Sequence, residues 1–69
     1  MITLEQMSKA EDKHINLYFT DGDVWKNKKC VSFENSGDED EEYALYFDAP
    51  NGNLYEVKQS KIEKIEILD

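Results

Sequence analysis

The sequence contains no arginine, and all eight of its cationic side chains are lysines. Lysine lacks the planar fork with which arginine binds a phosphate group or a guanine base through two parallel hydrogen bonds. The 16 acidic side chains give a formal net charge of -8, and an acidic surface repels nucleic acid and anionic lipid at long range. We therefore expect no direct nucleic-acid binding and no membrane binding.

Cysteine, glycine and long apolar runs are also scarce. Cys30 is the single cysteine, so the chain forms no internal disulfide and no thiolate cluster for a metal. The three glycines lie in separate turns and make no cradle for a phosphate group. No segment has the apolar length of a signal peptide or of a membrane span. The sequence predicts a cytoplasmic protein without a metal or other cofactor, and its lysine-only cations would suit a bacterial or phage genome.

A chain of 69 residues is long enough for one domain with a small core, so we assign residues 1–69 to a single domain. Residues 1–13 form an N-terminal arm with the apolar spacing of a short helix. Thr3 is placed to cap this helix, and Gln6 follows at the spacing of a capping box. The arm therefore predicts one short helix ahead of the main fold.

Alternation of apolar and polar residues predicts five strands after this arm. The strands cover residues 14–20, 24–34, 43–48, 54–59 and 64–68, with a 3₁₀ turn over 60–62 and an acidic loop over 35–42. Asp21-Gly22 between the first two strands is a strong hairpin signal. The two ends of the second strand differ in parity, which predicts a bulge or sharp bend near Asn27. The fold class is mainly β: a five-stranded small β-barrel with a short N-terminal helix.

Four features together resemble the Sm-like and SH3-like small β-barrels. They are the strand and turn Leu17-Tyr18-Phe19-Thr20-Asp21-Gly22, the long bent strand after it, Gly52 with Glu56, and the closing segment from Ser60 to Ile67. Their spacing is similar to that of the bacterial inhibitors of the Rho transcription terminator, small acidic Sm-like proteins that bind Rho and block its RNA site. RNA-binding Sm proteins carry an Arg-Gly motif in the fourth-strand region, where this chain has Gly52 followed by Asn53. The resemblance therefore implies a fold and a protein partner, without RNA binding.

Four aromatic residues are candidates for binding that partner: Tyr18, Trp25, Tyr46 and Tyr55. Tyr18 and Tyr46 point away from the apolar faces of their strands, so the alternation predicts that they are exposed. One interpretation is that the helix covers one of them, or that each is a single exposed aromatic of no special role. The other is that they cluster with Trp25 or Tyr55 in an interface, where tyrosine and tryptophan are enriched.

The acidic loop contains five consecutive carboxylates: Asp38, Glu39, Asp40, Glu41 and Glu42. This run carries -5 of the net charge of -8, so the other residues are only mildly acidic. It is either a solvated loop or an electrostatic handle that speeds association with a basic partner. The run does not match a calcium-binding loop.

Catalytic residues are not visible in the sequence. His14 lies on the polar face of its strand with no nucleophile at a motif spacing, and Cys30 lies among apolar neighbours, with Lys28 and Lys29 as the only reason to consider it reactive. The sequence predicts a non-enzymatic, acidic protein-binding module. The resemblance to the Rho inhibitors implies that this module occupies the basic site of a nucleic-acid-binding protein. The alternative is a homo-oligomeric Sm-like structural protein.

Overall fold

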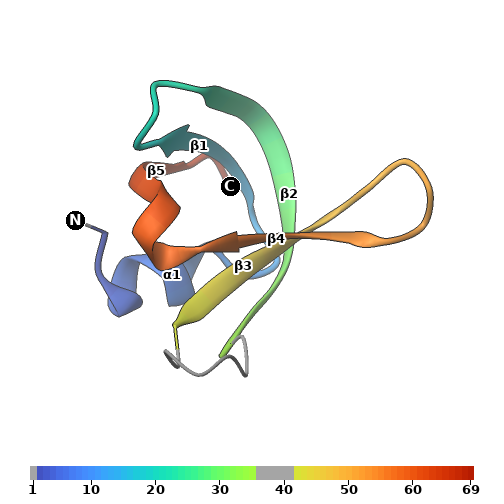
Figure 1. Cartoon of the computed structure of the whole chain (residues 1–69), viewed down its shortest axis with the longest axis horizontal. Helices are drawn as coiled ribbons and strands as arrows, with labels where there is room; N and C mark the ends of the chain where they lie inside the picture. Colours follow the sequence, from blue (N-terminus) through green and yellow to red (C-terminus); the bar gives the residue numbers. More distant parts are fainter. Residues whose placement is uncertain (1, 36–41) are drawn as a thin grey trace.

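The computed structural model describes residues 2–35 and 42–69, which form one helix, five strands and a 3₁₀ turn (Figure 1). In chain order these are α1 (Leu4–Ala10), β1 (His14–Phe19), β2 (Val24–Asn35), β3 (Tyr43–Asp48), β4 (Leu54–Lys58), η1 (Gln59–Lys61) and β5 (Ile62–Ile67). All strand pairs are antiparallel, in the order β4-β3-β2-β1-β5 across one sheet. The predicted mainly-β fold with five strands and a short helix is confirmed.

The helix α1 begins at a capping box, as the sequence predicts. Thr3 Oγ1 accepts a hydrogen bond from the Gln6 N–H at 3.1 Å, and Gln6 Oε1 accepts one from the Thr3 N–H at 3.0 Å. These bonds satisfy two donors at the start of the helix that have no partner within it. Met7 and Ala10 are fully buried in the core. Because α1 has only seven residues, its stability comes mainly from this packing.

Local backbone chemistry sets the path of β1 and β2. Gly22 has a φ of 96° in the turn between them, and Asp21 Oδ1 accepts a hydrogen bond from the Asp23 N–H at 3.0 Å. Within β2, Asn27 has a left-handed φ of 53°, and its N–H donates to Asn16 Oδ1 of β1 at 2.9 Å. The register of β1 with β2 shifts at this point, which confirms both the hairpin and the bulge.

Strand β2 belongs to both halves of the sheet. Its residues 24–29 pair with β1, and its residues 30–35 pair with β3. The strand curves strongly along its length, so the sheet is curled (Figure 1). The edge strands β4 and β5 are joined by the three residues of η1. The strand pairs of the described residues do not close the sheet by joining β4 to β5.

One face of the curled sheet carries the core, which α1 helps to cover. The cluster comprises Ile2, Met7, Ala10, Ile15, Leu17, Cys30, Leu45, Phe47, Val57 and Ile62. Sequence alternation predicts that Ile65 and Ile67 both point into this core. Ile65 is half-buried against it, whereas Ile67 pairs with Ile15 on the same face but lies at the end of β5, where it is 40% exposed. Burial therefore stops before the last residues of β5.

Candidate functional site

An aromatic cluster lies where β1, β2, β3 and β4 meet, with Trp25 at its centre. The Trp25 ring centroid lies 4.8 Å from that of Phe19 and 5.6 Å from that of Phe47, both in edge-to-face geometry. The Tyr55 centroid lies 5.7 Å from that of Trp25, with the two ring planes at 51°. Such pairs stabilise one another beyond the burial of their area, so each ring helps to hold its neighbours in place.

The strand register explains how these residues come together. Residues that pair across antiparallel strands point their side chains to the same face. Leu17 pairs with Trp25, and Phe47 pairs with Tyr55. Because Leu17 and Phe47 are buried in the core, Trp25 and Tyr55 both face the core side. Beyond the Asn27 bulge, Lys28 pairs with Ile15 and faces that side as well. The bulge therefore places Trp25 and Lys28, three residues apart, on one face.

A surface pocket of about 240 Å³ opens at this cluster. We call it the aromatic pocket; its lining residues are Trp25, Lys28, Phe47, Asp48 and Tyr55. Its volume is below the range of about 300–1,000 Å³ that is typical of small-molecule sites. The pocket therefore has room for one side chain of a partner rather than for a large ligand.

Tyr55 forms the exposed rim of the aromatic pocket, with 47% of its surface open to solvent. It also lines a second hollow of about 410 Å³ at the β3–β4 turn, together with Pro50, Asn51 and Leu54 among others. The turn depends on Gly52, which has a φ of 85°, and on Asn51 Oδ1, which accepts a hydrogen bond from the Asn53 N–H at 3.2 Å. A partner seated on Tyr55 would thus contact both hollows.

Lys28 and Asp48 supply the charge in the aromatic pocket. Within residues 2–35 and 42–69, neither side chain forms a salt bridge. Both residues are exposed. A ligand can therefore meet either charge without first displacing an intramolecular ion pair.

Tyr18 lies on the opposite face of the sheet from the aromatic pocket. Its O–H donates to Glu66 Oε1 of β5, and Lys64 Nζ lies 5.3 Å from its ring centroid. The hydrogen bond to the Glu66 carboxylate raises the pKa of Tyr18, and the same bond, with help from Asn16, lowers the pKa of Glu66. Tyr18 therefore serves to join β1 to β5.

Tyr46 also lies on the outer face, because it precedes Phe47 in an alternating strand. Its O–H donates to Glu56 Oε2 of β4 at 2.8 Å. The structure therefore brings together Trp25 and Tyr55 of the four predicted aromatics, and it places Tyr18 and Tyr46 on the other face. The α1 helix packs into the core on the Trp25 side and does not cover these two tyrosines.

Glu42 is the one residue of the acidic run that lies among the described residues. Glu42 Oε1 accepts a hydrogen bond from the Ser60 N–H of η1 at 2.6 Å. Asp38, Glu39, Asp40 and Glu41 lie outside the described residues. Glu42 thus links the end of the acidic run to the connection between the two edge strands.

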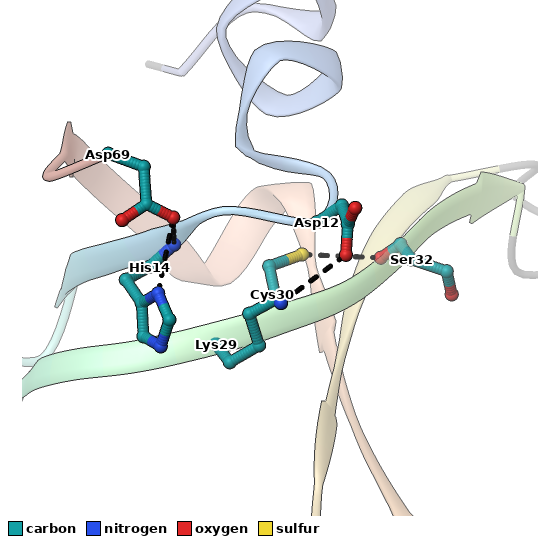
Figure 2. A network of polar contacts seen from close by, with 6 residues as sticks. All are labelled: Asp12, His14, Lys29, Cys30, Ser32 and Asp69. Carbon is teal, nitrogen blue, oxygen red and sulfur yellow. Dashed lines mark hydrogen bonds and ion pairs between the residues drawn. The ribbon is translucent and has the colours of Figure 1, made fainter.

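Cys30 and His14 are both held in polar contacts near the start of β1 (Figure 2). Cys30 is fully buried, its Sγ donates to the Ser32 carbonyl at 3.4 Å, and burial raises the pKa of its thiol to about 11. His14 faces Asp69, whose Oδ2 accepts from the His14 N–H at 2.8 Å and lies 3.1 Å from its Nδ1. The His14 N–H is the main cause of the lowered pKa of Asp69.

Three residues of the aromatic pocket are absent from the sequence-based candidates: Lys28, Phe47 and Asp48. Alternation in the third predicted strand places Phe47 on the apolar face, and it is 2% exposed in the core. Lys28 is not predicted because strict alternation from Trp25 places it on the opposite face, whereas the residue added by the bulge brings it to the same face. The bulge predicted near Asn27 is the signal for Lys28, because one added residue there moves Lys28 to the face of Trp25.

Among residues 2–35 and 42–69, no group of three or more potential metal ligands is close enough to hold an ion. No helix in this part of the chain is long and apolar enough to cross a membrane. Comparisons of the chain with protein-family models, with curated proteins and with solved structures find no match. The aromatic pocket is therefore the feature of this chain from which a function can be inferred.

Proposed function

We propose that this chain is a non-enzymatic protein-binding module whose partner presents a basic surface. The observation that carries the proposal is the aromatic pocket, in which Tyr55 is exposed against Trp25 on a chain of net charge -8. Tyrosine and tryptophan are enriched among the residues that dominate binding energy. An acidic surface raises the rate of association with a basic one. By resemblance to the Rho inhibitors, the partner is a nucleic-acid-binding protein whose basic site becomes occupied.

We also propose that the curled sheet is a small barrel of the Sm-like or SH3-like kind. Three features support this assignment. The fifth strand returns to pair with the first, β2 curves between the two halves of the sheet, and η1 joins the two edge strands over three residues. A sheet that curls in this way buries one face without needing a second sheet.

The state of the two most reactive residue types supports a non-enzymatic role. A thiol acts as a nucleophile in its thiolate form, and the buried Cys30 has a pKa of about 11, so little thiolate forms near neutral pH. Among residues 2–35 and 42–69, the His14 N–H and imidazole form their hydrogen bonds with the Asp69 carboxylate, and neither bonds to a hydroxyl or a thiol. Neither residue lines the aromatic pocket.

Affinity capture on the immobilised protein, at low and at high salt, tests the proposal. The wild type should retain a nucleic-acid-binding protein at low salt and release it at high salt, because exposed charges are screened. Tyr55→Ala should lose that protein, whereas Tyr46→Ala, on the neighbouring strand but the opposite face, should keep it. Circular dichroism checks that both variants fold. Equal capture by Tyr55→Ala, or capture that salt does not change, would contradict the proposal.

A homo-oligomer is the second candidate, and the edge strands favour it. Leu54 on the edge strand β4 is 51% exposed, and Ile67 on the edge strand β5 is 40% exposed. An unpaired edge with apolar side chains can pair with another chain. The charge of -8 on every copy opposes such assembly. Light scattering over a range of concentrations decides the question, since a monomer at every concentration excludes this candidate.

A further inference from the structure

We propose that the aromatic pocket binds the guanidinium group of an arginine side chain. This inference rests on the proposed function, since it identifies the group on the basic partner that the pocket would hold. The guanidinium would lie against the exposed ring of Tyr55 beside Trp25, and the Asp48 carboxylate would accept its hydrogen bonds.

The aromatic rings of the pocket can attract a cation. The face of an aromatic ring carries negative charge density, so it attracts a cation that lies within about 6 Å of the ring centroid. Tyr55 is 47% exposed and is held against Trp25 at 5.7 Å between centroids. This protein already contains one such contact on its other face, where Lys64 lies 5.3 Å from the centroid of Tyr18.

The Asp48 carboxylate favours a guanidinium group over an ammonium group. A carboxylate accepts two parallel hydrogen bonds from the planar guanidinium, which is also more weakly hydrated than an ammonium group and stacks on aromatic rings. Asp48 lines the same pocket as Tyr55. Two further carboxylates, those of Asp21 and Asp23, lie on the turn next to Phe19, which contacts Trp25.

One lysine opposes a cation at this site, because Lys28 lines the pocket. Lys28 would instead attract an anionic ligand such as a nucleotide, whose base can also stack on aromatic rings. Asp48 should strengthen the binding of a cationic ligand and Lys28 should weaken it, and the reverse should hold for an anionic ligand. Substitutions at the two positions can therefore identify the class of ligand.

The composition of the chain fits an arginine-binding site. Because the chain contains no arginine, no copy of the protein can fill the pocket of another with the proposed ligand. The pocket then remains open for an arginine that only a partner can supply.

A titration with capped tripeptides tests the inference. Trp25 is the only tryptophan, so its indole N–H resonance reports on the pocket alone. Acetyl-Gly-Arg-Gly-amide should shift this resonance in a saturable way at low ionic strength. The citrulline tripeptide, a neutral analogue of similar shape, should bind about fivefold more weakly because it loses the cation–π and ion-pair contributions. Equal binding of the citrulline or the lysine tripeptide would overturn the guanidinium assignment.

Charge variants then decide between a cation and an anion. Asp48→Asn should weaken the arginine tripeptide about two- to fivefold, and Lys28→Gln should tighten it about twofold. Both positions are exposed, so neither change should unfold the protein. Binding of cytidine monophosphate that Lys28→Gln weakens and Asp48→Asn strengthens, with no arginine binding, would replace the inference with a nucleotide site.

Failure of this inference differs from failure of the proposed function. If the Tyr55→Ala variant loses its captured partner while the arginine tripeptide leaves Trp25 unchanged, the arginine site is wrong and the protein-binding role stands. If the tripeptide binds with the expected charge dependence while no partner depends on Tyr55, the arginine site stands and the protein-binding role is wrong.

Discussion

Replacing Asn27 with valine should lower the free energy of unfolding by about 1–2 kcal/mol. Asn27 has a φ of 53°, in the left-handed region that asparagine tolerates and a β-branched side chain does not. Its N–H donates to Asn16 Oδ1 at 2.9 Å, so the surrounding strands hold this conformation in place. For a domain of this size, each 1 kcal/mol lowers Tm by about 4–8 °C, which gives an expected fall of about 4–16 °C.

Thermal unfolding followed by circular dichroism and by Trp25 fluorescence measures this effect. Lys26→Val is the matched control, because Lys26 is the exposed neighbour and does not have a positive φ. Valine there should be neutral or slightly stabilising in a strand. Asn27→Gly should unfold close to the wild type, since glycine adopts positive φ readily. Unfolding of Asn27→Val at the same temperature as Lys26→Val would refute the reasoning about backbone strain.

Three further predictions concern the core, acid stability and the thiol. Leu45 is fully buried, so Leu45→Ala should cost about 2–5 kcal/mol in urea unfolding; a cost as small as that of an exposed substitution would contradict the assigned core. Hydrogen bonds from the His14 N–H and the Tyr18 O–H lower the pKa values of Asp69 and Glu66 from 3.8 and 4.5. The folded protein thus binds fewer protons than the unfolded chain in this pH range. The two carboxylates therefore make their full contribution to stability above about pH 5, and this contribution is lost as the pH falls through their lowered pKa values. Asp69→Asn should flatten this fall, and an unchanged pH profile would exclude the contribution of Asp69. Cys30, with a pKa of about 11, should react with iodoacetamide at pH 8 about a hundredfold more slowly than an exposed cysteine; equal rates would show that the thiol is accessible.

The sequence is sufficient for the parts of the fold that depend on neighbouring residues. The Thr3 and Gln6 capping box and the Asp21-Gly22 turn form as predicted, because three or four residues contain all the groups involved. The five strands follow for a similar reason, since alternation over six residues already separates a buried face from an exposed one. The mainly-β class, with five strands and one short helix, could therefore be predicted from local chemistry.

The candidate site could be predicted only in part, because its residues meet through pairings between distant segments. Trp25 and Tyr55 are 30 positions apart in the numbering, and their rings come into contact because Phe47 of β3 pairs with Tyr55 and also contacts Trp25. Tyr18 lies apart from the aromatic pocket, and its hydroxyl donates a hydrogen bond to the carboxylate of Glu66, 48 residues away. Alternation indicates that a side chain points away from the core, but it does not indicate which residue from a distant strand that side chain contacts.

The pairing of β5 with β1 has a consequence for how the protein folds and opens. Asn16 and Glu66, which join these strands, are 50 residues apart, whereas short turns close the β1–β2 and β3–β4 hairpins. Closing a long loop costs more entropy, so we expect the hairpins to form first and β5 to dock late. Weakening β5, for example by Ile65→Val, should then speed unfolding with little effect on the folding rate, which stopped-flow kinetics in urea can measure. A slower folding rate in that variant would contradict late docking. The seam between β1 and β5 would then determine how long the native state lasts rather than how fast it forms.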